Sequence, residues 1–211
     1  MGNDVALQSS CTGSGRVASA QRFGSRETHT SKPRSPCHAG AVNPDWDLYE
    51  PLLSTALGIA ADESPPDWRG VFQPTFHEDA SITIRGRDLI VAQLRPGVRA
   101  QIMALIGVRG VTGRVDGDDR VEARATIPDA LFGKFEHTMK QIDPATLDSS
   151  MHAARDGIVL VGQVGRHRFR ASSPTRAAAP RHHAFFVALL QLAAGVLPDR
   201  PLLDELGRYL D

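Results

Sequence analysis

The chain has 211 residues, of which 41% are hydrophobic and 23% are charged, enough apolar material for one domain with a real core. Its 24 basic and 24 acidic residues cancel, so no overall field draws it toward nucleic acid or an anionic membrane. Nucleic acid and membrane are therefore not expected as partners. The longest apolar run, at 184–197, includes Gln191 and is too short to span a bilayer, which predicts a buried helix.

The first 43 residues differ in composition from the remainder. They contain seven Ser and few large apolar side chains, so they cannot bury enough surface to offset the entropy of ordering. We predict a disordered N-terminal tail over 1–43. Cys11 and Cys37, the only cysteines, both lie in this tail, so the folded part has no disulfide framework and a reducing cytoplasm is the expected location.

A helix is predicted directly after the tail. Asn43 before Pro44 is typical of a helix start, and apolar residues then recur at helical spacing as far as Ala60. Pro51 lies inside this pattern and predicts a kink or a restart. The Pro-containing segment 63–76 is predicted to be a loop with a short turn of helix.

Alternation of apolar and polar residues predicts β-structure in three places. The segment 80–84 is predicted to be a strand with Ser81 and Thr83 on a polar face. Segments 111–127 and 157–172 are predicted to be hairpins, because turn residues interrupt each alternating run.

Four further segments are predicted to be helical. The first is 86–94, ended by an Arg-Pro-Gly sequence. The others are 128–142, whose apolar residues form one stripe, 143–157, with Asp143 as its cap and Gly157 as its end, and the C-terminal region from Pro180 onward. Together these elements predict an α+β fold. We expect a curved antiparallel sheet packed by helices to form a domain over 44–175. A C-terminal helical extension over 176–211 is expected to pack on the same domain.

The sequence contains no strong signature of a metal site. Zinc sites need three or four converging ligands, usually flagged by short spacings such as HExxH, and no such spacing occurs here. The adjacent His77, Glu78 and Asp79 would point to alternating faces of an extended backbone. We expect no metal and no cofactor. The ligand candidates considered were His77, Glu78, Asp79, His167, His182 and His183.

Nucleophilic catalysis and nucleic-acid binding are likewise without strong support in the sequence. A GxSxG nucleophile elbow is absent, and the predicted domain contains no cysteine, so nucleophilic catalysis is not favoured. Arg166, Arg168 and Arg170 alternate with His167 and Phe169, a pattern that could bind phosphates and stack on a base. In a chain of zero net charge we interpret this arginine row as a solvated strand face.

Residues 44–172 resemble the nuclear transport factor two superfamily, which includes SnoaL-like polyketide cyclases and ketosteroid isomerases. The resemblance is carried by WDLYEPLLSTALG, DWRGVFQPTFHEDASITI, RGRDLIVAQL and VTGRVDGDDRVEARATI. Glu78 and Asp79 match the family's acidic turn, and Gly86-Arg87 its turn into the next helix. The resemblance implies a cone-shaped apolar cavity that holds a small molecule or supports dimerisation. The helices expected at 129–156 and the extension at 176–211 depart from the family pattern.

The resemblance also implies where a catalytic base would lie. In ketosteroid-isomerase-like members an Asp on the strand after the acidic turn abstracts a proton, but the matching position here is close to Ile84, beside Thr83. Neither side chain can take a proton near neutral pH. Tyr49 matches the family's oxyanion-donating tyrosine. A donor without a base favours a binding protein for a small apolar ligand or a second copy of the chain.

Two alternatives remain open. One is an enzyme of isomerase, cyclase or dehydratase type, with His77 or Asp79 as base and Tyr49 as donor. The other is a structural interaction module that docks another subunit through the apolar helix at 184–197. An enclosed pocket lined by His77 or Asp79 beside Tyr49 would favour catalysis, and a pocket lined only by apolar groups would favour binding. A filled core with an exposed apolar face on the helix at 184–197 would favour assembly.

Overall fold

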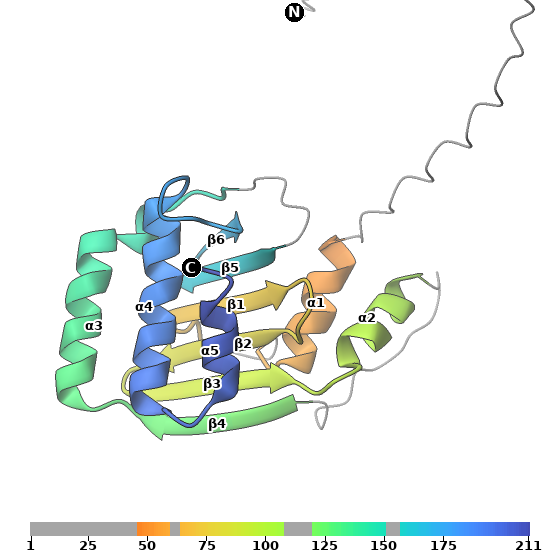
Figure 1. The fold of residues 1–211 in the computed structure, drawn as a ribbon, viewed down its shortest axis with the longest axis horizontal. Helices are drawn as coiled ribbons and strands as arrows, with labels where there is room; N and C mark the ends of the chain where they lie inside the picture. Colours follow the sequence, from red (N-terminus) through yellow and green to blue (C-terminus); the bar gives the residue numbers. More distant parts are fainter. Residues whose placement is uncertain (1–45, 60–63, 108–119, 151–156) are drawn as a thin grey trace, which may run out of the picture. The chain divides into compact units, whose positions relative to one another are not determined.

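The computed structural model describes residues 46–59, 64–107, 120–150 and 157–211. Within these ranges the chain forms a curved, open antiparallel sheet of six strands with helices on both faces (Figure 1). The α+β class and the curved sheet predicted from the sequence are thus confirmed. The predicted tail at 1–43 lies outside the described residues.

The strand order in the sheet is β4-β3-β2-β1-β5-β6, and all neighbouring strands are antiparallel. β1 therefore lies in the interior of the sheet, where it pairs with β2, the next strand in the chain, and with β5, which comes much later. The strands are β1 (Trp68–Pro74), β2 (Ala80–Arg85), β3 (Asp88–Leu94), β4 (Arg120–Thr126), β5 (Ile158–Val164) and β6 (His167–Ser172).

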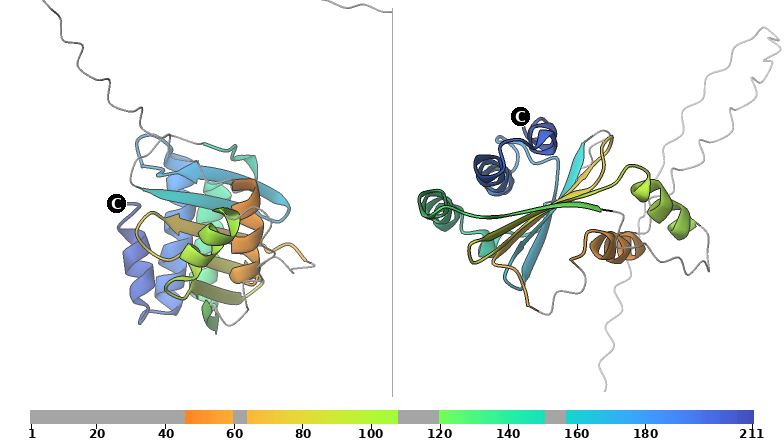
Figure 2. Two further views of the ribbon diagram at one scale, coloured as in Figure 1. Left: turned by 90° about the vertical axis from the view of Figure 1, so that its right-hand side faces the viewer. Right: turned by 90° about the horizontal axis from the view of Figure 1, so that it is seen from below.

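Helices cover the two faces of the sheet unequally (Figure 2). α3 (Asp129–Ile142), α4 (Pro180–Val196) and α5 (Pro201–Gly207) lie on one face, and α1 (Trp46–Ala56) and α2 (Val98–Gly107) lie on the other. None of the helices that the structure describes has the length and apolarity needed to cross a membrane. The predicted apolar stripe of α3 is confirmed, and it consists of Phe132, Phe135, Met139 and Ile142.

The larger core lies between the sheet and α3, α4 and α5. Phe169 of β6 contacts Phe185 and Phe186 of α4 edge-on, with ring centroids 5.1 and 6.1 Å apart. A Cβ atom on Gly162 of β5 would lie 2.2 Å from the Phe169 ring, so only glycine fits there. The predicted buried helix at 184–197 is confirmed, because its apolar residues fill this core.

A smaller core lies under α1 and α2, and it buries the polar face of β2, whose predicted strand and division of faces are confirmed. Ser81 and Thr83 do point away from the larger core, as the alternation indicates. They are nevertheless buried, because α1 and α2 cover part of the second face. The period of a strand reveals which residues share a face, but not whether that face is solvated.

The helix predicted at 86–94 is wrong. Gly86 adopts a positive φ of 55° in the turn that joins β2 to β3, and the segment after it is a strand. Leu89 and Val91 face the larger core, while Ala92 and Leu94 face the smaller one. A strand buried on both sides has a continuous apolar run, which has the same signature as a short buried helix.

The loop predicted at 63–76 is also wrong over half of its length, since 68–74 is the interior strand β1. The role of Gly70 within this strand is steric: a Cβ there would lie 2.9 Å from Leu189 of α4. Pro74 ends the strand, where its missing N–H is tolerated.

Two other segments were predicted only in part. In the hairpin predicted at 111–127, residues 120–126 form β4, whose described partner is β3, and 111–119 lie outside the described residues. The helix predicted at 143–157 is wrong at its start. Asp143 has a left-handed φ of 49°, and a single 3-10 turn, η1 (Pro144–Thr146), is followed by extended chain that bridges Ser150 to β6. Residues 151–156 lie outside the described residues.

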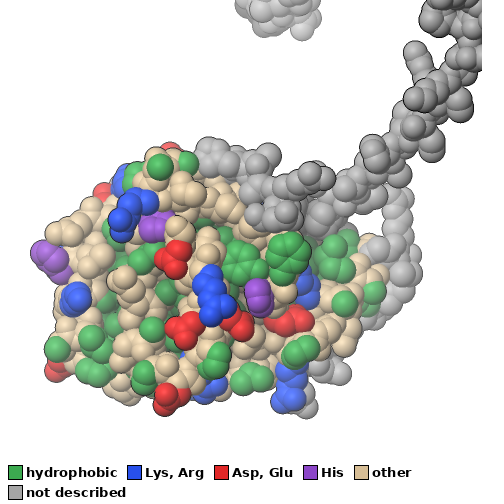
Figure 3. Space-filling model, in the orientation of Figure 1, with side chains coloured by type: hydrophobic (Ala, Val, Ile, Leu, Met, Phe, Trp, Pro, Cys, Tyr) green, Lys and Arg blue, Asp and Glu red, His purple; other side chains and the backbone are tan. Residues whose placement is uncertain are grey.

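The hairpin at 157–172 is confirmed as β5 and β6, with Gly165 at a φ of 55° in its turn. The face that carries α3, α4 and α5 shows basic, acidic and hydrophobic side chains interspersed (Figure 3). Arg168 and Arg170 of β6 point to the opposite face, where α1 lies.

Candidate functional site

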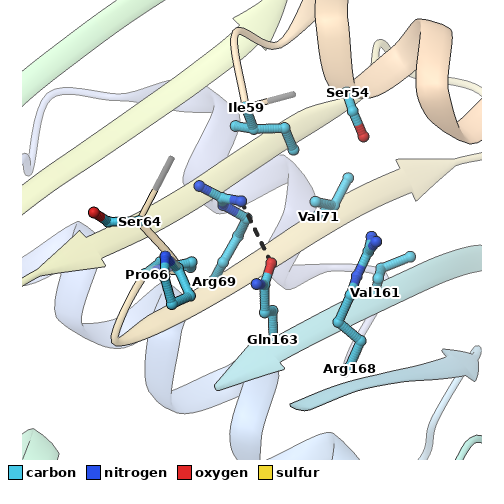
Figure 4. Close-up of a pocket in the computed structure, with 10 residues that line it drawn as sticks. Ser54, Ile59, Ser64, Pro66, Arg69, Val71, Val161, Gln163 and Arg168 are labelled. Carbon is cyan, nitrogen blue, oxygen red and sulfur yellow. Dashed lines mark hydrogen bonds between the residues drawn. The ribbon is translucent and has the colours of Figure 1, made fainter. Parts of the chain in front are cut away.

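A cavity of about 180 Å³ lies on the α1 face of the sheet, beside the end of α1 and above β1, β5 and β6 (Figure 4). Its walls combine charged and neutral polar side chains with an apolar floor from Val71 and Val161. The lining residues are Ser54, Ile59, Ser64, Pro65, Pro66, Arg69, Val71, Val161, Gln163 and Arg168.

Arg69 is held in this lining by side chains of both neighbouring strands. Its position on β1 pairs with Thr83 of β2 on one side and with Gln163 of β5 on the other. Arg69 Nε donates to Thr83 Oγ1 at 3.0 Å, and Nη1 donates to Gln163 Oε1 at 3.4 Å. The side chain is only 5% exposed. Side chains from both neighbouring strands thus help to fix the direction of the guanidinium.

A second basic group lies at the edge of the same cavity. Arg168 and Arg170 of β6 both donate to the carboxylate of Glu50 on α1. Since these two guanidiniums share one carboxylate, the three residues together keep one net positive charge. Arg168 lines the cavity and Arg170 does not.

A separate polar cluster lies under α1 and α2. Asp79, just before β2, is fully buried, and the Tyr49 hydroxyl of α1 donates to its Oδ2. Arg99 Nη1 of α2 lies 3.6 Å from Oδ1, which has no hydrogen-bond partner among the described residues. Arg99 also donates to the backbone carbonyls of Pro74 and His77, the latter at 3.2 Å. These contacts join α1, the β1–β2 connection and α2.

Burial dominates the ionisation of this cluster. Removal from water raises the pKa of Asp79 to about 6, although the nearby Arg99 charge and the Tyr49 hydrogen bond act in the opposite direction. Burial, reinforced by the Asp79 carboxylate, raises the pKa of Tyr49 above its ordinary value. Tyr49 therefore remains a protonated donor at any physiological pH.

The structure brings Tyr49 and Asp79 together but leaves His77 apart from them. His77 is exposed, and its Nδ1 lies 2.7 Å from the Tyr209 hydroxyl. It lines an open groove of about 570 Å³ with Phe76, whose side chain is 71% exposed. Glu78 Oε1 accepts a hydrogen bond of 2.9 Å from the Gly97 N–H just before α2. Tyr49 and Asp79 line neither the cavity nor this groove.

The histidines considered as metal ligands are engaged elsewhere. Ring nitrogens of His167, His182 and His183 lie 2.7–2.8 Å from backbone carbonyl oxygens. Within the described ranges, the His, Cys, Asp and Glu side chains form no group of three that could hold a metal ion.

No protein-family model matches the chain, and no curated protein matches it in sequence. The site is therefore assigned from geometry alone. Sequence reasoning did not select Arg69 or Gln163. A signal existed in WRGVF, where a charged residue interrupts apolar ones, but it was taken as loop composition.

Proposed function

We propose that this protein binds a small anionic molecule, one that carries a carboxylate or a phosphate, in the cavity beside the end of α1. The observation that carries the proposal is the orientation of Arg69 in the cavity wall. A guanidinium presents a planar fork of donors that matches carboxylate and phosphate oxygens. An interior strand holds such a group more rigidly than a loop does.

The rest of the lining supports an anion rather than the apolar ligand expected from the sequence. Ser54 and Ser64 contribute hydroxyl groups to the lining. Arg168 contributes positive charge, because the single carboxylate of Glu50 neutralises only one of the two arginines bonded to it. The apolar part of the lining consists of the floor from Val71 and Val161 together with Ile59, Pro65 and Pro66. A volume of about 180 Å³ limits the ligand to the size of a small metabolite.

Calorimetric titration with phosphate, acetate, succinate and neutral amide analogues tests the proposal. We expect anions to bind and the neutral analogues not to bind. Arg168→Ala should weaken binding about tenfold, a typical effect of losing one charge-assisted hydrogen bond. Arg170→Ala is the matched control: Arg170 also pairs with Glu50 but does not line the cavity, so its loss removes the same charge without a cavity donor and should weaken binding less than the loss of Arg168. Absence of anion binding at about 10 mM, or equal losses in both variants, would contradict the proposal.

A second candidate is an enzyme of isomerase, cyclase or dehydratase type, as the resemblance to the SnoaL-like proteins suggests. It is favoured by the contact between Tyr49 and Asp79, since a carboxyl with a pKa of about 6 beside a hydroxyl donor suits proton transfer. It would need a route for substrate to two residues that are at most 1% exposed. Turnover of a ketosteroid or polyketide substrate that Asp79→Asn abolishes would establish this candidate.

We further propose a cytoplasmic location, because Cys11 and Cys37 are the only cysteines of the chain and both precede the sheet and its helices.

A further inference from the structure

The two edge strands of the sheet, β6 and β4, differ in what lies on their outer sides. At β6, the Ser150 N–H donates to the Arg170 carbonyl at 2.7 Å, and the Ser172 N–H donates to the Ser150 carbonyl at 3.1 Å. Chain outside the strands thus covers part of that edge. At the other end of the strand order, β4 bonds to β3, and on its outer side the described residues place no further strand.

One hydrogen bond shows which residues of β4 direct their backbone N–H and C=O groups toward β3. The Ile127 N–H donates to the Arg87 carbonyl at 2.8 Å, so odd-numbered residues of this strand direct their backbone groups toward β3. Direction alternates along an antiparallel ladder. The even-numbered residues Arg120, Glu122, Arg124 and Thr126 therefore direct N–H and C=O groups away from the sheet. Such a row of donors and acceptors is a template for another strand.

We propose that β4 pairs antiparallel with β4 of a second copy of this chain, about a two-fold axis at Ala123. In that register Glu122 faces Arg124 of the partner subunit, and the symmetric contact repeats on the other side of the axis. Both residues are even-numbered, so their outward backbone groups also meet. Val121, which is 45% exposed, faces Ala125 of the partner subunit and loses apolar surface to water.

Side-chain charge selects this register over its neighbours. Sliding the strands by two residues one way places Glu122 opposite itself, and sliding them the other way places Arg124 opposite itself. Like charges directly opposite each other are destabilising. A shift of one residue places even-numbered residues, whose backbone groups point outward, opposite odd-numbered residues, whose backbone groups already bond to β3. The two strands could then not form the ladder of hydrogen bonds. Charged residues commonly protect edge strands from pairing, but here the alternation of sign makes the edge self-complementary in one register.

Glu122 is already placed for such a role. In its own strand it accepts from Arg124 and lies 3.2 Å from Arg120, so its carboxylate sits between two guanidiniums. A two-fold arrangement extends this row into alternating charges across both strands. One strand pair buries less than the roughly 1,200–2,000 Å² of a typical stable interface, so we expect a dissociation constant in the micromolar to millimolar range.

Disulfide trapping tests the register. In a background with Cys11→Ser and Cys37→Ser, Ala123→Cys should form a covalent dimer under mild oxidation. Residues opposite each other at a non-hydrogen-bonded pair have Cα atoms about 4.5 Å apart, within reach of a disulfide. Val121→Cys and Ala125→Cys are the matched controls. Each should remain monomeric alone, and a mixture of the two proteins should cross-link, because each faces the other.

Sedimentation of uncross-linked protein tests the charge argument. Glu122→Arg or Arg124→Glu alone should raise the dissociation constant at least tenfold, and the double variant should restore it, with circular dichroism confirming that each variant is folded. The proposal is overturned by a wild-type protein that is monomeric at about 1 mM. It is equally overturned if Ala123→Cys cross-links no more than its controls, or if the double charge swap does not restore dimerisation.

Discussion

Replacing Asp79 by Asn tests the energetics of the buried cluster. The substitution keeps the size of a side chain that is fully buried, and the new amide oxygen still accepts from the Tyr49 hydroxyl. What it removes is the ability to ionise. It also removes the attraction to Arg99, 3.6 Å away. The experiment therefore measures whether burial or the ion pair decides the stability of the charged form.

The magnitude follows from the difference in proton affinity between the folded and unfolded chains. The pKa of Asp79 rises from an ordinary 3.8 to about 6 on folding. Because the folded pKa is the higher one, the stabilisation from this group is fully present below about pH 4 and is lost as pH rises through 6. A difference of about two units corresponds to about 3 kcal/mol of unfolding free energy.

Urea unfolding followed by tryptophan fluorescence between pH 4 and pH 8 is the assay. The two proteins should be similar in stability at pH 4, where the wild-type carboxyl is protonated when folded. At pH 7.5 Asp79→Asn should be more stable by about 2–3 kcal/mol. The arginines bonded to Glu122 lower the pKa of that carboxyl, so its stabilisation is lost only as pH falls below about 4.5. It is common to both proteins and cancels in the comparison.

A variant less stable than wild type by more than about 1 kcal/mol at pH 7.5 would refute this reasoning. That result would mean that attraction to Arg99, weighed against desolvation, makes the ionised form the favoured one. Unchanged pH dependence in the variant would refute it too, because the titration would then belong to other groups.

Two further predictions concern the core and the cavity. Gly162→Ala should destabilise the protein by about 2–3 kcal/mol in urea unfolding, because the added methyl overlaps the buried Phe169 ring. Gly133→Ala, at an exposed position of α3 with nothing within 4 Å, should instead stabilise it by about 0.5–1 kcal/mol, and equal effects at both sites would contradict the packing argument. Glu50→Gln should tighten anion binding about threefold to tenfold in calorimetric titration, because it removes the carboxylate shared by the two β6 arginines. Weaker binding would show that Glu50 serves mainly to position Arg168.

Elements with one buried and one solvated side were predictable from the sequence. The stripe of α3 and the turn of the β5–β6 hairpin at Gly165 both leave a periodic signal, and both predictions are confirmed. β1 and β3 have no such signal, because helices pack on both faces of the sheet near them. The reason for Gly70 in β1, the side chain of Leu189, lies more than a hundred residues away in the chain, so no local pattern reports it.

The residues of the candidate site likewise fall into those that a local pattern indicates and those that only the tertiary fold defines. His77, Glu78 and Asp79 drew attention as a polar group, and alternation along the chain did indicate that they face different surroundings. The burial of Asp79 depends on α1 and α2 together, and no local pattern reports that. Arg69 is defined by Thr83 and Gln163, which reach it only through strand pairing. Residues of a site that is assembled from three strands have no characteristic spacing along the chain, so the sequence alone does not reveal them.

The interior position of β1 has a consequence for how the chain folds as it is synthesised. β1, β2 and β3 can associate as soon as residue 94 has emerged, because their connections are short. The other side of β1 must wait for residues 158–164, and the aromatic packing against Phe169 waits longer still for α4. A growing chain therefore presents the unpaired second edge of β1 to the cell while residues 95–164 are synthesised. Assistance from a chaperone at this stage would shorten the period in which nascent chains can aggregate.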